Sequence, residues 1–400
     1  MMQKIKVKNP IVEMDGDEMA RVMWQEIKQK LIVPFLDLPI EYFDLGIKNR
    51  DLTEDQVTID AANATKDIGV AVKCATITAT KARQKEFLLK KIYKSPNGTI
   101  RNIIGGTVFR EPILVSNIKP IVRNWNKPII IGRHAFADQY KAHDFYVEKG
   151  SKVSLKIEDK NGIREELIND FQDSSGVVLG MFNLETSIKN FAYSCFKFAL
   201  DKKWPLYFSS KNTILKQYDQ LFVDIFADIY KKEFAADFIA NNISYQHRLI
   251  DDMVAFALKS EGGFIWACKN YDGDVQSDNL AQAFGSLGLM SSVLVSVDGK
   301  IKLAEAAHGT VTRHYQKHKK GKATSTNPIA SIFAWSRALL HRAKLDSNQD
   351  LYNFSNKIEK LVLEIVESGF VTKDLANLTG VRKFVTMSEF IDKISLEMQK

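Results

Sequence analysis

Cysteine and proline are both scarce in this chain. Its 400 residues include only three cysteines and nine prolines. Cys74, Cys195 and Cys268 are widely separated, and each is surrounded by apolar residues. An odd number of distant cysteines argues against a disulfide framework and against a zinc site. We therefore expect three buried thiols in a protein of a reducing compartment.

Long apolar runs and targeting segments are missing as well. No stretch of 18 apolar residues occurs, so we expect no membrane span. The amino terminus has no apolar signal core, and acidic residues occur as early as Glu13 and Asp15. We expect a cytoplasmic protein, although a processed chain of the mitochondrial matrix would look the same.

Two common nucleotide-binding fingerprints are also absent. Neither G-x-G-x-x-G nor G-x-x-x-x-G-K-[ST] is present, so the sequence predicts neither a Rossmann phosphate turn nor a P-loop. Any nucleotide must be held by other residues.

The net charge of +8 favours an anionic partner. The positive excess is spread along the chain, and no RNP, zinc-finger or basic-helix pattern accompanies it. Acidic clusters would repel a phosphate backbone, so we expect a small polyanion and not nucleic acid. The basic stretch 315–322 is predicted to be a solvated loop.

The order of apolar segments predicts an α/β fold. A strand at 11–14, a helix at 55–67 and a buried strand at 69–75 form the pattern of a mostly parallel sheet. Alternating polar and apolar residues around Asn161-Gly162 predict a β-hairpin within 150–168, as an inserted arm. The chain is too long for one hydrophobic core, so we expect two or three lobes. Further apolar patterns predict strands at 127–134 and 293–295 and helices at 187–202, within 214–260 and within 350–397.

Carboxylates gather in two short segments. Asp251 and Asp252 lie in one apolar helical run, and Asp272-Gly273 is predicted as a turn that leads into a helix with Asp274 and Asp278. Residues four apart share one helix face. Carboxylates without neighbouring Cys or His suit Mg²⁺ or Mn²⁺. The alternative is that these acids only cap helix amino termini.

Three arginines are predicted at the ends of loops or strands. Arg101 ends the turn-rich loop 95–101, Arg110 follows two glycines, and Arg133 ends the strand at 127–134. Singly, each arginine is most often a surface charge. Together they suit the planar recognition of several carboxylates.

A phosphate-binding segment is predicted at 308–314, where a Gly-Thr loop follows a strand. Its backbone N–H groups, with Arg313 and His314, would suit a phosphate, although such loops are common. Asn327 and Pro328 are typical of the start of a helix.

With these segments in order, the chain resembles the NADP-dependent isocitrate dehydrogenases of homodimeric type, within the isocitrate/isopropylmalate dehydrogenase family. The resemblance covers essentially the whole chain. It rests on Ser-Pro-Asn-Gly-Thr-Ile-Arg-Asn at 95–102, Gly-Gly-Thr-Val-Phe-Arg at 105–110, Ile-Ile-Ile-Gly-Arg-His at 129–134, Tyr-Asp-Gly-Asp-Val-Gln-Ser-Asp at 271–278 and Ala-Ala-His-Gly-Thr-Val-Thr-Arg-His at 306–314.

This resemblance implies an α/β fold that is not a Rossmann fold and that has three parts. The large domain would comprise 1–104 and 285–400, the small domain 105–137 and 185–284, and a β-rich clasp 138–184. It also implies a homodimer whose clasp strands interlock and whose active sites are each built from two chains.

The resemblance further implies site residues. The three carboxylates of isocitrate would be held by Thr78, Ser95, Asn97, Arg101, Arg110 and Arg133. Mg²⁺ or Mn²⁺ would be held by Asp274, Asp278 and the partner's Asp251. Proton transfer would involve Tyr140 and the partner's Lys211. The NADP site would be lined by Lys73, Thr76, Arg83, Gly309, Thr310, Val311, Arg313, His314 and Asn327, with the partner's Lys259. The chain departs from the family pattern at Phe256, where relatives carry glutamine near the NADP adenosine.

The implied activity is the metal-dependent oxidative decarboxylation of isocitrate to 2-oxoglutarate, with reduction of NADP, as in the tricarboxylic acid cycle. Relatives that act on isopropylmalate, homoisocitrate or tartrate are the nearest alternatives. An apolar substrate arm would leave the polar groups of Ser95, Asn97 and Arg101 unpaired, which argues against isopropylmalate. A non-catalytic RNA-binding protein is disfavoured by the full catalytic set and by the lack of an aromatic stacking platform.

Overall fold

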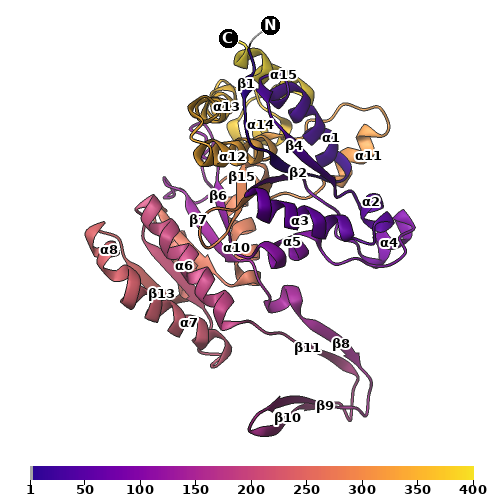
Figure 1. Ribbon diagram of the computed structural model, residues 1–400, viewed down its shortest axis with the longest axis vertical. Helices are drawn as coiled ribbons and strands as arrows, with labels where there is room; N and C mark the ends of the chain where they lie inside the picture. Colours follow the sequence, from indigo (N-terminus) through magenta and orange to yellow (C-terminus); the bar gives the residue numbers. More distant parts are fainter. Residues whose placement is uncertain (1–2) are drawn as a thin grey trace.

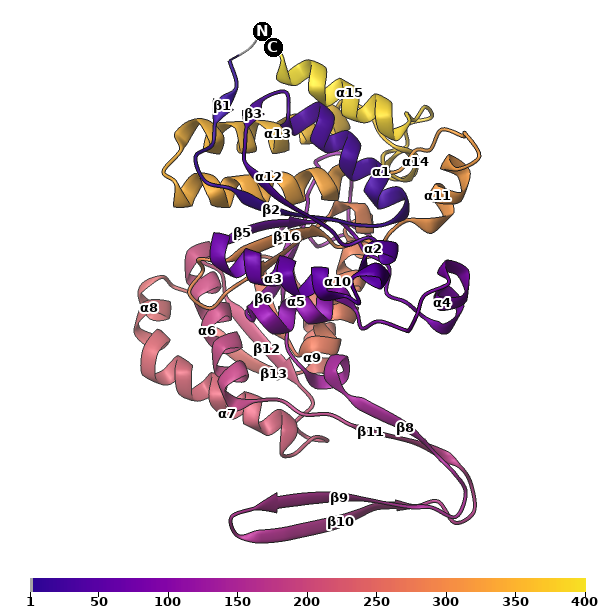
Figure 2. The same cartoon turned by 45° about the vertical axis from the view of Figure 1, so that its right-hand side comes forward.

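One mixed ten-stranded sheet runs through the computed structural model, which describes residues 3–400 (Figures 1 and 2). Its strand order is β13-β12-β14-β7-β6-β15-β16-β5-β2-β4. The strands are β2 (Ile11–Asp15), β4 (Ile40–Asp44), β5 (Val70–Lys73), β6 (Thr107–Pro112), β7 (Ile129–His134), β12 (Leu206–Ser210), β13 (Tyr245–Leu249), β14 (Phe264–Cys268), β15 (Met290–Val295) and β16 (Lys302–Ala306).

The strand directions divide this sheet into two parallel blocks. The strands β13, β12, β14 and β7 are parallel to one another, and so are β16, β5, β2 and β4. In between, β6 and β15 pair in antiparallel fashion with each other and with the blocks beside them. The predicted mostly parallel α/β sheet is therefore confirmed, with an antiparallel centre that the sequence pattern did not predict.

Helices cover both faces of the sheet (Figure 2). Their bounds are α1 (Glu18–Ile27), α2 (Ile47–Leu52), α3 (Gln56–Ile68), α4 (Lys81–Phe87), α5 (Pro96–Ile104), α6 (Glu185–Lys202), α7 (Tyr218–Ile229), α8 (Ala235–Ala240), α9 (Ile250–Lys259), α10 (Asn270–Ala283), α11 (Thr312–His318), α12 (Ile329–Leu345), α13 (Gln349–Glu367), α14 (Lys373–Thr379) and α15 (Met387–Met398). None of the helices between residues 3 and 400 combines the length and apolar character that a bilayer span requires.

The apolar interior is divided into separate clusters. One lies among α1, α12, α13 and α15, where the rings of Trp24 and Trp335 are 5.2 Å apart. Another lies under α6 and α7, where Phe196, Phe208 and Phe226 pack together. More than one core is what a chain of this length requires. The three cysteines are buried and free, which confirms the prediction of three buried thiols.

Two β-ribbons extend away from the ten-stranded sheet (Figures 1 and 2). The strands β8 (His143–Val147) and β11 (Gly176–Gly180) form one antiparallel pair, and β9 (Lys152–Asp159) and β10 (Gly162–Asp170) form the other. The chain turns between β9 and β10 at Lys160-Asn161. The predicted hairpin is therefore confirmed.

Several local predictions are wrong. The expected turn at Asp272-Gly273 lies inside α10, and most of the expected loop 95–101 is the first part of α5. The basic stretch 315–322 is not all loop, because α11 extends to His318. The strand β13 lies within the region 214–260, for which only helices were predicted.

Gly273 explains one of these errors. A Cβ atom at this position would lie 2.8 Å from Cβ of Arg133, so glycine lets α10 approach β7 closely. Its role is the close approach of two elements and not the turn that Asp-Gly usually indicates.

Candidate active site

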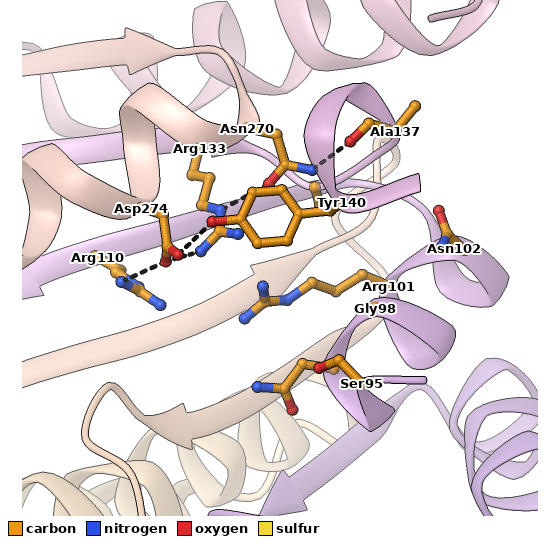
Figure 3. Close-up of a pocket in the computed structure, with 12 residues that line it drawn as sticks. Ser95, Gly98, Arg101, Asn102, Arg110, Arg133, Ala137, Tyr140, Asn270 and Asp274 are labelled. Atoms are coloured by element: carbon orange, nitrogen blue, oxygen red, sulfur yellow. Dashed lines mark hydrogen bonds and ion pairs between the residues drawn. The ribbon is translucent and has the colours of Figure 1, made fainter. Parts of the chain in front are cut away.

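A cavity of about 170 Å³ lies where α5 and α10 meet β6 and β7 (Figure 3). The predicted substrate-binding residues Arg101, Arg110 and Arg133 reach this cavity from three different elements, and all three are buried. The lining consists of Ser95, Asn97, Gly98, Arg101, Asn102, Arg110, Arg133, Ala135, Ala137, Tyr140, Asn270 and Asp274.

Each arginine is fixed by a polar partner. Arg101 Nη2 donates to Glu305 Oε1 at 2.8 Å, Arg110 Nη1 donates to Ser277 Oγ at 2.7 Å, and Arg133 Nε donates to Asn270 Oδ1 at 2.9 Å. Burial and the charges of Arg101 and Arg110 lower the pKa of Arg133 to about 9. Three mutually repelling guanidinium groups in one cavity require negative charge nearby.

Asp274 supplies part of that negative charge. Its Oδ1 pairs with Arg133 and lies 3.4 Å from Arg110 Nη1, and its Oδ2 accepts a hydrogen bond from Tyr140 (Figure 3). Burial raises the pKa of Asp274, but the charges of Arg133 and Arg110 outweigh burial and leave this pKa below its usual value.

Asp278 lies one helical turn beyond Asp274 on α10, as the spacing predicted. Its Oδ1 is 3.4 Å from Arg110 Nη1, and burial raises its pKa. The two aspartates therefore both present carboxylate oxygens to Arg110, while only Asp274 lines the cavity. Such oxygens are the ligands that Mg²⁺ and Mn²⁺ prefer, so the donor set fits a hard divalent cation.

Tyr140 lies on a short 3-10 turn, Asp138–Lys141, that begins the ribbon region. Asp138 anchors this turn, since its carboxylate accepts hydrogen bonds from the side chains of Asn183 and Tyr218. The guanidinium carbon of Arg133 lies 4.6 Å from the centre of the Tyr140 ring. Burial and the hydrogen bond to Asp274 raise the pKa of Tyr140 to about 12, so the phenol keeps its proton at neutral pH.

A row of paired residues crosses the sheet beside this cavity. Arg110 on β6 is opposite Ser292 on β15, Ser292 is opposite Glu305 on β16, and Glu305 is opposite Lys73 on β5. Residues directly opposite one another in a sheet share a face. The row therefore connects a predicted substrate residue with a predicted cofactor residue through the buried carboxylate of Glu305.

Lys73 is buried and donates hydrogen bonds to Cys74 O at 3.0 Å and to Thr76 Oγ1 at 3.2 Å. Its Nζ lies 3.9 Å from Glu305 Oε2. Burial lowers the pKa of Lys73, whereas Arg101 and Lys73 hold the pKa of Glu305 below its usual value despite burial. The structure thus brings together the predicted pair Lys73 and Thr76.

The remaining predicted substrate residues are Ser95 and Asn97, at the amino end of α5, and Thr78, in the segment between β5 and α4. Thr78 Oγ1 donates to Ser95 Oγ at 3.4 Å. Among the described residues, Asn97 Oδ1 and Arg110 Nε are buried without a hydrogen-bond partner. Buried polar atoms of this kind are costly unless a ligand satisfies them.

A second cavity of about 590 Å³ lies beside the predicted phosphate-binding segment. Val311, His314 and Asn327 line it. His314 Nδ1 is 2.8 Å from Thr326 Oγ1, and Asn327 Nδ2 donates to Asp374 Oδ2 at 2.9 Å. Three of the predicted NADP residues therefore share one cavity.

Other predicted NADP residues gather around Glu18. Arg83 Nη1 lies 3.2 Å from Glu18 Oε1, and Glu18 Oε2 accepts hydrogen bonds from the hydroxyls of Thr310 and Thr312. Arg83 also donates to Thr312 Oγ1 at 2.9 Å, so α4 is joined to the amino end of α11. Gly309 and Arg313 are exposed beside this cluster and do not line either cavity.

The predicted residues Lys211, Asp251 and Lys259 also lie outside both cavities of this chain. Lys211 Nζ pairs with Asp251 Oδ1 at 2.6 Å, and this hydrogen bond lowers the pKa of Asp251. Lys259 ends α9, the helix that begins next to Asp251. Within residues 3–400, no three His, Cys, Asp or Glu side chains lie close enough together to hold a metal ion. Among the described residues, Asp274 and Asp278 therefore have no third such side chain beside them.

Phe256, the departure from the family pattern, has a packing role in this chain. The guanidinium carbon of Arg248 lies 4.4 Å from its ring centre, and the ring of Tyr207 lies 4.8 Å away.

The sequence reasoning missed several residues that fix the site. Asn270 and Ser277 lie four residues before and three residues after Asp274 on α10, so helical spacing would have found them. Glu305, Glu18 and Asp374 carry no local signal, because each meets its partners only through the folded sheet and loops.

Comparison with known proteins identifies relatives over the whole chain. Residues 6–394 match the isocitrate/isopropylmalate dehydrogenase family. The mitochondrial NADP isocitrate dehydrogenase of Homo sapiens is 59% identical over 407 residues, with 100% of this chain and 90% of that protein covered. The corresponding enzyme of Sus scrofa is 59% identical, with 100% and 96% covered. NADP isocitrate dehydrogenase 1 of Mycobacterium tuberculosis is 57% identical over 401 residues, with 99% and 98% covered.

These relatives thus include mitochondrial and bacterial enzymes, and their matches extend across the arginine-lined cavity and both ends of the sheet. The chain belongs to the isocitrate/isopropylmalate dehydrogenase family of oxidoreductases.

Proposed function

We propose that this chain oxidises and decarboxylates isocitrate to 2-oxoglutarate and CO₂ while reducing NADP to NADPH, with Mg²⁺ or Mn²⁺. The observation that carries this proposal is the cavity that three buried arginines line together with Asp274 of α10. The names of the relatives support isocitrate as the substrate and NADP as the cofactor.

The substrate's three carboxylates would bind Arg101, Arg110 and Arg133. Guanidinium groups bind carboxylates through two parallel hydrogen bonds, and these three groups converge on one small cavity (Figure 3). Ser95 and Asn97 at the start of α5, with Thr78 from the segment before α4, would supply the polar contacts, which would also satisfy Asn97 Oδ1.

Asp274 and Asp278 would hold the divalent cation together with the partner's Asp251. A bound cation would act as a Lewis acid toward the substrate's oxygens. Asp274 now neutralises Arg133 and Arg110, and substrate carboxylates would replace it there. Binding of the substrate would therefore release Asp274 for the metal.

Tyr140 and the partner's Lys211 would transfer the protons. A phenol with a pKa of about 12 carries its proton at neutral pH and can donate it to the substrate carbon after CO₂ leaves. Lys211, in its uncharged amine form, would remove the proton of the substrate hydroxyl directly or through a water molecule, and Asp251 would hold Lys211 Nζ in place.

The proposed NADP site would include the second cavity, and bound NADP would supply the hydride acceptor. Lys73, Thr76 and Arg83 would contact it from β5 and α4. The segment after β16 would contact it through Gly309, Thr310, Val311, Arg313 and His314, with Asn327 and the partner's Lys259. Arg313 and His314 are the groups that would recognise the 2′-phosphate, because cationic side chains favour a phosphate there and an acidic one would repel it.

We further propose that the chain works as a homodimer with shared sites. The ribbons expose apolar side chains, with Phe145 61% and Val177 76% accessible, and exposed apolar clusters mark interfaces. One lobe would comprise residues 1–104 and 285–400, the other lobe residues 105–137 and 185–284, and the clasp residues 138–184.

The cytoplasm remains the compartment that we propose, and cell fractionation would test it.

The activity is tested by following NADPH absorbance with threo-isocitrate and Mn²⁺, with NADP or NAD in separate reactions. We expect turnover with NADP that a chelator abolishes. Asp274→Asn should be inactive, while the control Asp228→Asn, which breaks an exposed pair with Lys232, should be fully active. Faster turnover with NAD would contradict the assignment of Arg313 and His314.

The shared site is tested by mixing two inactive variants. In a heterodimer of Lys211→Gln and Asp274→Asn chains, one site would carry both defects and the other would be intact. Co-expression should thus restore about a quarter of the normal activity, since about half of the dimers are mixed and each has one good site. No restoration, in a sample that is shown to contain mixed dimers, would contradict the shared site.

A further inference from the structure

The three central strands present a second hollow on the face of the sheet opposite the active-site row. Phe109 pairs with Val293, Glu111 pairs with Ser291, and Val295 pairs with Lys302. These residues alternate with Arg110, Ser292 and Glu305 along β6, β15 and β16, so their side chains point to the other face. Helices α6 and α12 lie on either side of this face (Figures 1 and 2).

Two adjoining cavities of about 270 and 300 Å³ occupy this position, and we call them together the back groove. They share Phe109, Phe198, Asp201, Val295 and Lys302, so they form one continuous hollow. Apolar groups line part of it, including the rings of Phe109 and Phe198, which stack 3.9 Å apart. An apolar lining with a few charged groups is typical of small-molecule sites.

Cations outnumber acids around the first of these cavities. Lys202, Lys302, Arg337 and Lys344 line it together with only Glu111 and Asp201. His341 adds no charge, because burial lowers its pKa to about 4 and its Nε2 lies 2.8 Å from Lys300 O.

Glu111 bridges two of these cations. Its Oε1 lies 2.8 Å from Lys202 Nζ on α6, and its Oε2 lies 3.9 Å from Arg337 Nη1 on α12. Arg337 Nε also lies 2.8 Å from Glu359 on α13. Lys202 and Arg337 are therefore already partly neutralised.

Lys302 and Lys344 differ from these two. Neither forms an ion pair with any acidic side chain between residues 3 and 400. Lys302 is half-buried, and burial together with Lys344 lowers its pKa, while the charge of Asp201 in the same groove offsets part of this effect. An ammonium group that is partly removed from water and has no acid within ion-pair distance is stabilised by a bound anion.

We propose that the back groove binds a small phosphate-bearing anion through Lys302 and Lys344, with Lys202 and Arg337 at its edge. Lysine ammonium groups act as point charges that suit phosphate oxygens, whereas carboxylates are matched best by arginine forks. The ligand would compete with Glu111 for Lys202 and Arg337. Glu111 adjoins Arg110 in β6, so the groove and the substrate cavity are linked through one strand.

Calorimetric titration of the full-length protein with pyrophosphate tests this proposal. NADP and isocitrate are kept saturating in the presence of a chelator, so that the proposed active-site anion positions are filled and turnover is prevented. Wild type should bind pyrophosphate, and Lys302→Gln combined with Lys344→Gln should weaken binding by about tenfold or more. Lys344→Gln alone, an exposed position at the end of α12, should show a smaller loss and guards against misfolding of the double variant.

The matched control removes two lysines elsewhere. Lys232→Gln combined with Lys360→Gln breaks two exposed helical ion pairs and changes the net charge equally, and it should bind pyrophosphate as wild type does. Absence of binding in wild type, or equal binding in the groove variant and wild type, would overturn the proposal. Tighter binding of citrate than of pyrophosphate at the groove would overturn the assignment to phosphate.

Discussion

Replacement of Asp274 by asparagine should have opposite effects on catalysis and on metal-free substrate binding. Asp274 is a proposed metal ligand, so Asp274→Asn should abolish turnover. In this structure, however, its carboxylate pairs with Arg133 and Arg110, the groups that we propose bind isocitrate. The substrate must displace this carboxylate before it can bind both arginines.

The size of the expected gain in isocitrate affinity follows from the solvent exposure of Asp274. The Asp274 side chain is 36% accessible, so solvent screens its two ion pairs and each contributes about 1 kcal/mol or less. Removing the competing charge therefore makes about 1–2 kcal/mol available to the ligand. Metal-free isocitrate should bind Asp274→Asn about 5- to 30-fold more tightly than wild type.

Asp278 provides the matched comparison. It is 58% accessible and has a single contact, 3.4 Å from Arg110 Nη1. Asp278→Asn should thus also lose activity but should tighten metal-free binding less than about fivefold.

Isothermal titration with isocitrate in the presence of a chelator measures both variants, without NADP so that no reaction occurs. Circular dichroism and thermal unfolding would verify that the variants are folded. Unchanged or weaker binding by folded Asp274→Asn would refute the idea that its carboxylate competes with the substrate. Equal gains in the two variants would refute the assignment of the effect to Arg133.

Three further substitutions test the frame of the site. Glu305→Gln leaves the buried Arg101 without its carboxylate, so urea unfolding should show a loss of about 3 kcal/mol, and a loss below about 1 kcal/mol would contradict this. Gly273→Ala places a methyl group 2.8 Å from Cβ of Arg133. This variant should therefore lose about 1–3 kcal/mol of unfolding free energy and show a higher KM for isocitrate. An unchanged KM would count against the close approach of α10 to Arg133. Burial lowers the pKa of His134 to about 4. Between about pH 6.5 and pH 4, the imidazole therefore binds a proton in the unfolded chain but not in the folded chain. The free energy of unfolding should consequently fall by up to about 3 kcal/mol as the pH is lowered through this range. His134→Gln should flatten that dependence in urea titrations, and an equal pH slope in both proteins would exclude His134 as its source.

The sequence predicted best those elements whose signal is local and strong. Residues 129–134 are a continuous apolar run because β7 is buried on both faces, and all six residues are buried in the structure. The hairpin that turns at Lys160-Asn161 was found for a similar reason, since its turn signal and alternating strands lie next to one another in the chain.

The errors arose where one residue type serves two purposes. Ser95-Pro96 is typical of a loop and equally of the first turn of a helix, and the structure starts α5 there. Asp272-Gly273 indicates a turn, but α10 needs glycine to approach Arg133. In both cases packing between distant segments decided the conformation, and a single sequence carries no record of that packing.

Glu305 shows why the site depends on strand register, which no single sequence displays. It lies between Ser292 and Lys73 in the row that begins at Arg110, with the row fixed by backbone hydrogen bonds. Adjacent strands are about 4.8 Å apart, so three steps from β6 to β5 set Arg110 and Lys73 about 14 Å apart at their backbones. Because Glu305 contacts both Arg101 and Lys73, one carboxylate neutralises a group from each proposed subsite. A slip of one residue on β16 would turn Glu305 to the back groove and leave both cations buried without a counter-charge, so the charge row and the register stabilise each other.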